Sequence, residues 1–261
     1  MRILLPPSEG KSPGGRGRPL RDQRVDGPLV APRASVRAAL AEVVGRSPED
    51  AAQALLLPAA VRDAALRDNA RVCDAPTMPA LRRYRGVLYD GLASVGLSPA
   101  EQRRAAAGVL IFSGLFGVLR GDEQIPAYRV PAKAVLPRLG VVGTFWRPIL
   151  DEVLPNLLRT GPVIDLRSSD YAAMWRPRGA IADRVITVRV LSPIPRGGLA
   201  VVSYLSKHAK GRLTGHLIRS AAGRVLSAGD VAEIWCANGG RDANVRDRAV
   251  ELVTDPAGTH P

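Results

Sequence analysis

The sequence predicts an α/β fold, with α+β as the alternative, in one compact domain that has a mixed sheet and surrounding helices. Short apolar runs of strand length alternate with longer Ala- and Leu-rich segments of helical spacing. The chain has 261 residues, 46% of them hydrophobic, so it is long enough to bury a sizeable core. Because no repeat, low-complexity tract or clean linker divides it, we expect a single domain over residues 1–250 and a flexible tail over 251–261.

The first half of the chain begins with a short apolar run at residues 2–5, which predicts a buried strand. A Gly-, Pro- and Arg-rich loop follows, and residues 34–46 then have helical spacing. Ser47-Pro48 supplies an N-cap and a proline at the first helical position. Helices are therefore expected over residues 49–70 and 79–95.

The second half of the chain continues the alternation of helices and strands. Ser98-Pro99 repeats the helix start signal. The expected helices are 98–106, 144–158 and 205–219. Apolar runs predict the strands 108–112, 163–166, 184–191 and 199–204.

The formal net charge of +13 comes from 37 basic and 24 acidic residues. Such a charge is typical of proteins that bind nucleic acid or another anion, but 33 of the basic residues are Arg and only 4 are Lys. The excess of Arg beside many Ala, Gly, Pro and Val residues is typical of a GC-rich genome, which raises the charge without a functional reason. The lysines Lys11, Lys133, Lys207 and Lys210 therefore indicate positions where an amine serves better than a guanidinium.

Composition excludes several classes of protein. No stretch approaches the ~18 apolar residues of a membrane span, and the N-terminal apolar patch is too short for a signal peptide. We therefore expect a cytoplasmic protein with no membrane partner. Cys73 and Cys236 are far apart, and the three histidines form no ligand pattern, so neither a disulfide scaffold nor a metal or other cofactor is expected. The oligomeric state stays open.

Polar or ionisable residues follow three of the expected strands. They are Ser8-Glu9-Gly10-Lys11, Ser113-Gly114 and Ser168-Ser169-Asp170-Tyr171. Ligands of open α/β sheets collect beyond the carboxyl ends of strands, so these segments are expected to meet in one cleft. The alternative is that polar residues end strands everywhere. Gly10-Lys11-Ser12 matches only part of the phosphate-loop pattern, and we reject a nucleotide triphosphatase.

The segment 113–129 has the most unusual composition in the chain. Gly114 and Gly117 allow a tight turn or a close approach of the backbone to a ligand. Arg120 and Arg129 suit recognition of a carboxylate or a phosphate. A glycine-hinged turn with surface arginines is the alternative interpretation.

Lys207 and Lys210 lie three residues apart near the start of the last expected helix and share a helical face. Two ammonium groups at this spacing repel each other unless an anion lies between them or one pKa is depressed. A phosphate, a carboxylate or a nucleic-acid backbone is therefore the expected ligand, with a solvated basic face as the alternative.

Five motifs occur in an order that points to a known family. They are Gly86-Val-Leu-Tyr-Asp-Gly-Leu92, Ser113-Gly-Leu-Phe-Gly-Val-Leu-Arg120, Tyr128-Arg129, Asp165-Leu-Arg-Ser-Ser-Asp-Tyr171 and Lys207-His-Ala-Lys-Gly211. Together with a looser match at Ser8-Glu9-Gly10-Lys11, they resemble the YaaA family of peroxide-stress resistance proteins from residue 1 to about residue 240. The chain departs from the family pattern at Phe116, Gly121, Asp165, Asp170 and Lys210.

The resemblance implies a compact α/β protein with a positively charged cleft and a helix-hairpin-helix-like element. It also implies DNA binding, a lowering of free intracellular iron and protection of DNA and proteins from peroxide. Because the sequence holds no metal-ligand set, any effect on iron is expected to be indirect.

Two functions are carried forward. The first, which the resemblance favours, is a stress protein that binds the backbone of duplex or junction DNA. The second is an enzyme acting on an anionic small molecule (a nucleotide, nucleoside or sugar phosphate), with Lys207 or Lys210 as nucleophile or general base and Glu9 or Tyr171 as proton carrier. The expected ligand-binding residues are Ser8, Lys11, Ser113, Gly114, Arg120, Tyr128, Arg129, Lys133 and Ser168.

Overall fold

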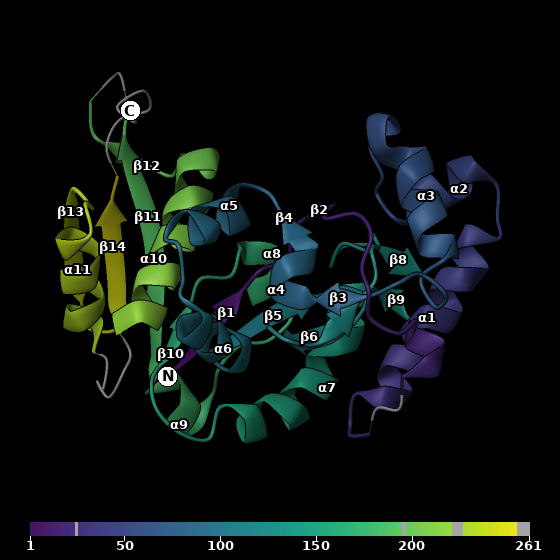
Figure 1. The fold of residues 1–261 in the computed structure, drawn as a ribbon, viewed down its shortest axis with the longest axis horizontal. Coiled ribbons are helices and arrows are strands. Elements are labelled where there is room, and N and C mark those ends of the chain that lie inside the picture. The colour runs from purple at the N-terminus through teal and green to yellow at the C-terminus, as the bar shows by residue number, and fades with distance from the viewer. Residues whose placement is uncertain (24–25, 195–196, 221–226, 255–261) are drawn as a thin grey trace.

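A central sheet of mostly parallel strands organises the molecule (Figure 1). The computed structural model describes residues 1–23, 26–194, 197–220 and 227–254. The strands of the sheet are β1 (Arg2–Leu5), β5 (Val109–Ser113), β6 (Gly117–Arg120), β10 (Val163–Asp165), β11 (Val185–Pro193), β12 (Leu199–Ala200), β13 (Asp242–Arg246) and β14 (Ala249–Val253). Neighbours follow the order β13-β14-β11-β10-β1-β5-β6, and β12 pairs with β11.

The parallel strands have the order of a doubly wound fold. After β1 the chain adds β5 on one side, and it then adds β10, β11 and β14 in turn on the other side. A parallel order of 2-1-3-4-5 places the topological switch point between the first and third strands, which are β1 and β10 in this chain. Since β6 and β13 are antiparallel to their neighbours, the sheet is mixed and the predicted α/β class is confirmed.

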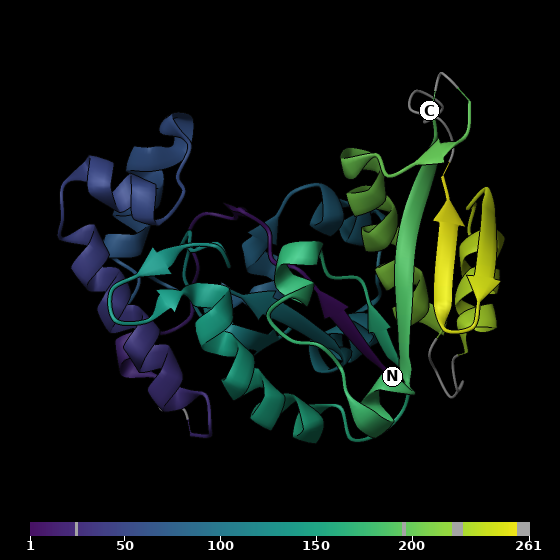
Figure 2. The same ribbon diagram turned by 180° about the vertical axis from the view of Figure 1, so that it is seen from behind.

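Helices cover both faces of the sheet. Their bounds are η1 (Leu20–Asp22), α1 (Val30–Val44), α2 (Pro48–Ala54), η2 (Ala59–Val61), α3 (Arg62–Ala70), α4 (Ala80–Arg83), α5 (Val87–Ser94), α6 (Pro99–Gly108), α7 (Val142–Leu157), α8 (Ser169–Ala172), α9 (Gly179–Ala182), α10 (Ser203–Ser220) and α11 (Ala228–Ala237). Figures 1 and 2 show α5 and α6 towards one face and α7 and α8 towards the other. The helices α1 to α3 lie together at one end of the molecule, and α11 packs on β13 and β14 at the other. Within the described ranges, no helix combines the length and the apolar character needed to cross a bilayer.

Three short strand pairs fasten the loops to one another. They are β2 (Gly10–Lys11) with β4 (Tyr84–Arg85), β3 (Met78–Pro79) with β7 (Gln124–Ile125), and β8 (Val135–Leu136) with β9 (Gly140–Val141). In the first pair Lys11 lies opposite Tyr84. This pairing holds part of the expected long N-terminal loop against the segment that precedes α5.

The helix starts predicted at Ser47 and Ser98 are confirmed. The Ser47 hydroxyl accepts a hydrogen bond from Asp50 N–H at 3.1 Å, and Ser98 forms a capping box with Glu101. The expected helix over 49–70 is divided, because α2 ends before Leu56, whose φ of 53° is left-handed.

Two further expectations differ from the structure. The expected helix over 79–95 is broken at Gly86, whose φ of 118° is accessible to glycine and strained for other residues. The expected strand over 199–204 is shortened to β12, since α10 already begins at Ser203. In the expected tail, β14 includes residues 251–253, and residues 255–261 lie outside the described residues.

The helices α5 and α10 cross at two glycines that belong to the conspicuous motifs of the sequence. A Cβ atom on Gly211 would lie 1.9 Å from the carbonyl oxygen of Leu88, and one on Gly91 would lie 2.3 Å from that of His208. These two glycines therefore have a packing role, because only a hydrogen atom fits between the two backbones.

We expect Gly211→Ala to lower the free energy of unfolding by about 1–3 kcal/mol, because the helices must move apart to accept the methyl group. Gly229→Ala in α11 is the matched control, since the nearest atom to its new Cβ would be Ser227 Oγ at 3.5 Å. Urea unfolding of both variants measures the difference. Equal stability of the Gly211→Ala protein and the parent protein would contradict the packing role.

Candidate functional site

The loops after β1, β5 and β10 begin side by side at one edge of the sheet. The central strand β1 pairs with both of the others, so that Leu4 lies opposite Leu110 on one side and Asp165 on the other. The hydrogen bond from Leu166 N–H to the Leu4 carbonyl, at 3.0 Å, extends this pairing beyond the end of β10. The sheet order thus brings together the three polar segments that the sequence analysis singled out.

A cavity of about 220 Å³ lies between the loops that follow β1 and β10. We call it the β1–β10 cavity. It is lined by Glu9, Leu56, Arg129, Pro131, Ala132, Lys133, Asp170 and Tyr171. It therefore gathers four of the residues chosen from the sequence (Glu9, Arg129, Lys133 and Tyr171) at the switch point of the sheet, where doubly wound proteins bind ligands.

Two ion pairs line the β1–β10 cavity. Arg129 Nε lies 3.3 Å from Glu9 Oε2, and Lys133 Nζ lies 2.8 Å from Asp170 Oδ1. The formal charges of these four groups cancel, so this cavity is balanced in charge. Since both carboxylate side chains are more than two-fifths exposed, the pairs cost little to separate when a ligand competes for the cations.

Helix α3 fixes the position of Arg129 through a residue that the sequence analysis did not select. The Asn69 side chain is buried, accepts a hydrogen bond from Arg129 N–H at 2.8 Å and donates one to the Arg129 carbonyl at 3.0 Å. A side-chain amide offers both a donor and an acceptor, so Asn69 holds the Arg129 backbone as a neighbouring strand would.

Three hydroxyl groups form a buried chain beside the cavity. The Tyr128 hydroxyl lies 2.6 Å from Ser113 Oγ and 2.6 Å from the Tyr84 hydroxyl, and Ser113 Oγ accepts a hydrogen bond from Phe116 N–H at 3.1 Å. Burial raises the pKa of Tyr84 and of Tyr128 above the ordinary value for tyrosine. Both phenols therefore stay protonated at neutral pH. Each hydroxyl can accept a hydrogen bond from one neighbour while it donates one to the next.

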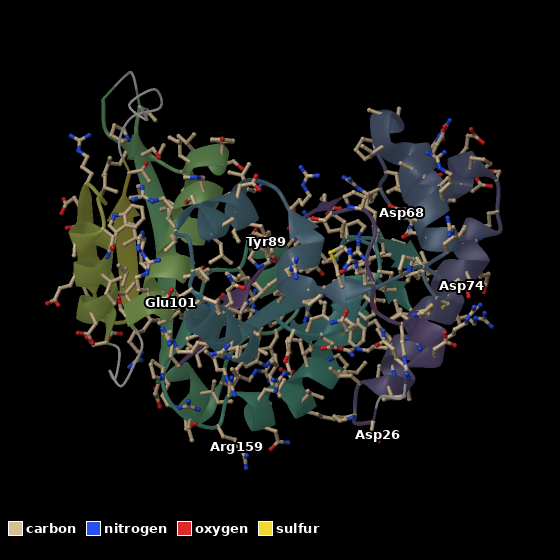
Figure 3. All side chains as sticks on the ribbon, in the orientation of Figure 1. Asp26, Asp68, Asp74, Tyr89, Glu101 and Arg159 are labelled. Atoms are coloured by element: carbon tan, nitrogen blue, oxygen red, sulfur yellow. The ribbon has the colours of Figure 1, made fainter. Side chains whose placement is uncertain are left out.

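Lys11 lies beside this chain of hydroxyl groups, on β2. Its Nζ donates to the Ser8 carbonyl at 2.8 Å and lies 4.4 Å from the centre of the Tyr128 ring. Burial lowers the pKa of Lys11 to about 8, an effect that Glu9 opposes and Arg129 supports. Figure 3 labels Tyr89 on α5 and Asp68 on α3, which lie on opposite sides of the β2–β4 pair in this view.

The two lysines of α10 have different surroundings. Lys210 Nζ donates to the carbonyls of Leu166 at 3.1 Å and Arg167 at 3.4 Å, and burial lowers its pKa. Lys207 is exposed. Lys210 therefore ties α10 to the loop after β10, and the structure does not hold the two amines against one common group.

Two of the expected ligand-binding residues have structural contacts in the loops. Gly114 lies so close to Val130 that an added Cβ would be 2.2 Å from its carbonyl oxygen, and the Gly114 carbonyl accepts a hydrogen bond from Trp146 Nε1 at 2.8 Å. The Ser8 hydroxyl donates to the Arg85 carbonyl. These contacts explain both residue types without a ligand.

Two others lie at the margin of the strand-end region or outside it. Ser168 is exposed at the start of α8. Arg120 pairs with Asp122 at 3.2 Å and lies opposite Leu110, away from the carboxyl end of β5. Arg120 therefore does not join the β1–β10 cavity.

Among the described residues, three buried arginines hold the loops of the site. Arg167 forms a two-bond ion pair with Asp165, at 2.9 and 2.7 Å, and donates to the carbonyls of Tyr171 and Trp175. Arg83 donates to the carbonyls of four residues from three separate segments of the chain, and Arg33 donates to those of Phe116 and Val118. Of these three arginines, Arg167 lies in the Asp165–Tyr171 motif of the sequence, whereas no motif contained Arg83 or Arg33.

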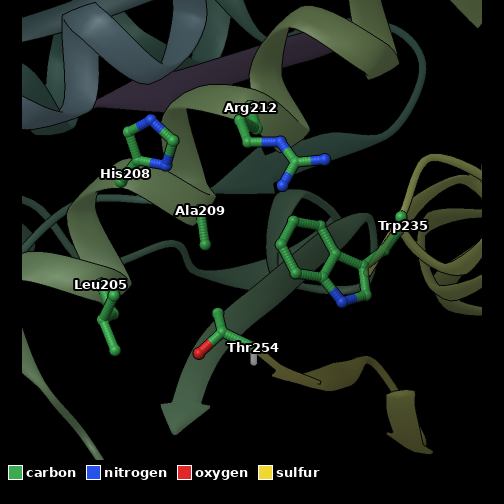
Figure 4. Close-up of a pocket in the computed structure, with 7 residues that line it drawn as sticks. Leu205, His208, Ala209, Arg212, Trp235 and Thr254 are labelled. Carbon is green, nitrogen blue, oxygen red and sulfur yellow. The ribbon is translucent and has the colours of Figure 1, made fainter. Parts of the chain in front are cut away.

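A second, much smaller cavity lies between α10 and α11 (Figure 4). Its volume of about 20 Å³ has room for about one water molecule. The Arg212 guanidinium lies 5.8 Å from the centre of the Trp235 ring across it. In the part of the chain that the structure describes, no group of three or more His, Cys, Asp or Glu side chains is placed to hold a metal ion.

The fold and this site define a doubly wound α/β protein with a ligand-sized cavity at its switch point. The family model described as "Peroxide stress protein YaaA" matches residues 1–231. A UPF0246 protein of Streptomyces coelicolor is 42% identical over 219 residues, which cover 84% of this chain and 83% of the relative. A UPF0246 protein of Corynebacterium efficiens is 39% identical over 246 residues, covering 90% of this chain and 91% of the relative. The chain belongs to the YaaA family, as the resemblance predicts.

We expect Arg167→Met to lower the free energy of unfolding by about 3–5 kcal/mol, because it leaves the Asp165 carboxylate, whose side chain is only 12% exposed, without its partner. The control is Arg189→Met, which breaks an ion pair with Glu251. Because the Arg189 side chain is 65% exposed, this change should alter the free energy of unfolding by less than about 1 kcal/mol. Urea unfolding curves compare the two. A loss below 1 kcal/mol for Arg167→Met would contradict the structural role of this guanidinium.

The lowered pKa of Lys11 should make the free energy of unfolding depend on pH. The unfolded chain, in which the lysine pKa is 10.5, binds more protons than the native state between that value and the native pKa of about 8. The free energy of unfolding of the parent protein relative to Lys11→Met should therefore rise by about 2 kcal/mol from pH 7.5 to pH 9.5. Denaturant unfolding of both proteins at the two pH values measures it, and a constant difference would show that Lys11 has an ordinary pKa.

Proposed function

We propose that this protein acts in the response to peroxide stress by binding a small anionic molecule of the nucleotide class in the β1–β10 cavity. The observation that carries the proposal is the position of that cavity at the switch point of a doubly wound sheet, with ionised and aromatic side chains around it. The role in peroxide stress rests on the family.

The lining of the cavity matches a ligand that has both an acidic group and an apolar face. A phosphate or carboxylate can replace Glu9 on Arg129, or Asp170 on Lys133, without leaving either cation unpaired. The Tyr171 ring and the Leu56 side chain, which is 53% exposed, supply apolar surface that would pack against a planar base. A nucleotide combines these features, whereas a sugar phosphate lacks the planar face.

The protonation states of the lining residues limit their chemical roles. Burial raises the pKa of Tyr171 well above the ordinary value, so its hydroxyl can donate a hydrogen bond or a proton but is not a base at neutral pH. Glu9 is the carboxylate nearest to Arg129, and its exposed side chain can accept a proton from a bound ligand. If the protein is an enzyme, Glu9 is therefore the proposed base and Tyr171 the proposed acid.

Binding of AMP, adenosine and ribose 5-phosphate, measured by calorimetry, tests the proposal. We expect AMP to bind, and Arg129→Gln to weaken its binding at least about tenfold, because a charge-assisted hydrogen bond contributes roughly 1.5–3 kcal/mol. Arg120→Gln, outside the cavity, should leave the affinity unchanged. No binding of any of the three compounds, or equal affinity of the Arg129→Gln protein, would contradict the proposal.

DNA binding is the second candidate, and a separate groove supports it. This groove, of about 670 Å³, is lined by Arg16 and Arg82 together with residues that carry no negative charge. Both arginines are exposed, and the net charge of +13 would strengthen their attraction to phosphates. A cationic cleft, a helix-hairpin-helix element and protection from iron-dependent damage belong to this candidate, because the family resemblance implies them together.

The salt dependence of duplex binding tests this second candidate. If Arg16 and Arg82 each neutralise one phosphate, the double variant Arg16→Gln/Arg82→Gln should reduce the slope of log K against log salt by about two. Arg189→Gln/Arg248→Gln is a control with the same loss of net charge at another surface. Equal slopes for the two double variants would exclude this groove as the DNA-binding surface.

A further inference from the structure

Lys11 adjoins a second cavity that the proposed function does not use. This cavity of about 350 Å³, here called the Lys11 cavity, is lined by residues 11–14, by Asp68 of α3 and Arg71 at the end of that helix, and by Ala75, Pro76, Arg83 and Ala127. It lies on the α3 side of the β2–β4 pair, where Figure 3 labels Asp68. Among the described residues that line it, Asp68 alone carries a carboxylate, beside the amine of Lys11 and the guanidinium groups of Arg71 and Arg83, so these residues carry net positive charge.

The hydrogen bonds of Lys11 suit an uncharged amine. Its Nζ donates to the Ser8 carbonyl at 2.8 Å and is 3.4 Å from the Glu9 carbonyl. Among the described carboxylates, none lies within 4.0 Å of this nitrogen to form an ion pair. A neutral amine has two N–H groups, which these carbonyls can accept, and its lone pair remains available to an electrophile.

The groups around Lys11 act on its charge in both directions. The rings of Tyr84 and Tyr128 exclude water from the amine, which lowers its pKa, while attraction to the faces of the rings opposes this effect. Of the charged neighbours, Arg129 and Arg83 lower the pKa, and Glu9 and Asp68 raise it. The result, a pKa of about 8, leaves about a tenth of the amine uncharged at pH 7 and about a quarter at pH 7.5.

The other three lysines have surroundings that suit other roles. Lys133 is paired with Asp170, Lys210 is held by two carbonyl groups, and Lys207 is exposed. In a chain with 33 arginines, a guanidinium at position 11 would supply charge and hydrogen bonds, but it could not lose a proton to become a nucleophile.

We propose that Lys11 is a nucleophilic amine that condenses with a small aldehyde or ketone carrying a carboxylate or phosphate, bound in the Lys11 cavity. The amine nitrogen bonds to the carbonyl carbon, and the electron pair of the C=O π bond moves to the oxygen, which takes up a proton. The resulting carbinolamine loses water to give an imine, so that amine and carbonyl compound become imine and water with no change in oxidation state.

Arg71 is the residue that would hold the acidic group of this compound. It is exposed on the Lys11 cavity, whereas the Arg83 guanidinium is already engaged with the carbonyls of Ser12, Gly14, Pro76 and Ile125. This inference does not depend on the β1–β10 cavity, so either proposal can fail while the other stands.

Trapping of the imine with borohydride tests the inference on the unmodified chain, whose other lysines are internal controls. The protein is incubated at pH 7.5 with glyoxylate, glycolaldehyde phosphate or neutral glycolaldehyde, reduced, and mapped by mass spectrometry. We expect Lys11 to be modified at least about ten times faster than Lys133 or Lys207 by one or both anionic compounds, as the lowered pKa of Lys11 allows. Modification of Lys11 no faster than that of Lys133 would overturn the proposal.

Two variants separate the chemistry from the fold. Lys11→Arg keeps a donor and a charge at this position and should abolish the Lys11 adduct while the circular dichroism spectrum is retained. Arg71→Gln should slow trapping by the preferred anionic compound at least about fivefold and leave trapping by glycolaldehyde unchanged. An equal rate for charged and neutral compounds in the parent protein would overturn the assignment of Arg71.

Discussion

Buried guanidinium groups donate hydrogen bonds to backbone carbonyl groups in and beside the loops near the carboxyl edge of the sheet. Arg83 alone reaches the carbonyls of Ser12, Gly14, Pro76 and Ile125, and it thereby joins the segment that follows Lys11 to two distant parts of the chain. Arg167 does the same for the turn after β10. A buried polar group is stable only when its hydrogen bonds are made, and five fixed donors allow one arginine to satisfy several loop carbonyls. The shape of both cavities depends on these contacts.

The basic residues of these loops and of the two cavities consequently fall into two groups. The buried arginines hold loops, because a guanidinium keeps its charge and its planar set of donors. The cations around the two cavities face groups that a ligand can replace or react with: Arg129 faces an exposed carboxylate, and Lys11 has a lowered pKa in the absence of a close carboxylate among the described residues. The net charge of +13 therefore comes from basic residues that have different roles. The β1–β10 cavity, whose charges are paired, is suited to a small ligand with its own acidic group.

The sequence was sufficient to predict the elements with strong local signals. Apolar runs located β1, β5 and β10, Ser-Pro pairs located the starts of α2 and α6, and the polar ends of the three strands do meet at one edge. Two-residue strands such as β2 and β4 have no periodicity to detect, so the position of Lys11 opposite Tyr84 had no local signal. Burial of Asn69 and Arg83 is set by contacts between residues far apart in the chain. Gly91 and Gly211, which belong to motifs that carry the family resemblance, allow α5 and α10 to approach closely.

Survival of peroxide challenge in a bacterium that lacks its own family member tests most directly whether the β1–β10 cavity carries the function. The cells would express the parent protein, Arg129→Gln or Arg120→Gln at matched levels. Arg129→Gln removes the charge that would hold the acidic group of the ligand, and Arg120 lies outside the cavity and pairs with Asp122. The account predicts that Arg129→Gln gives no more protection than an empty vector, while Arg120→Gln protects as the parent protein does. Full protection by Arg129→Gln would contradict it.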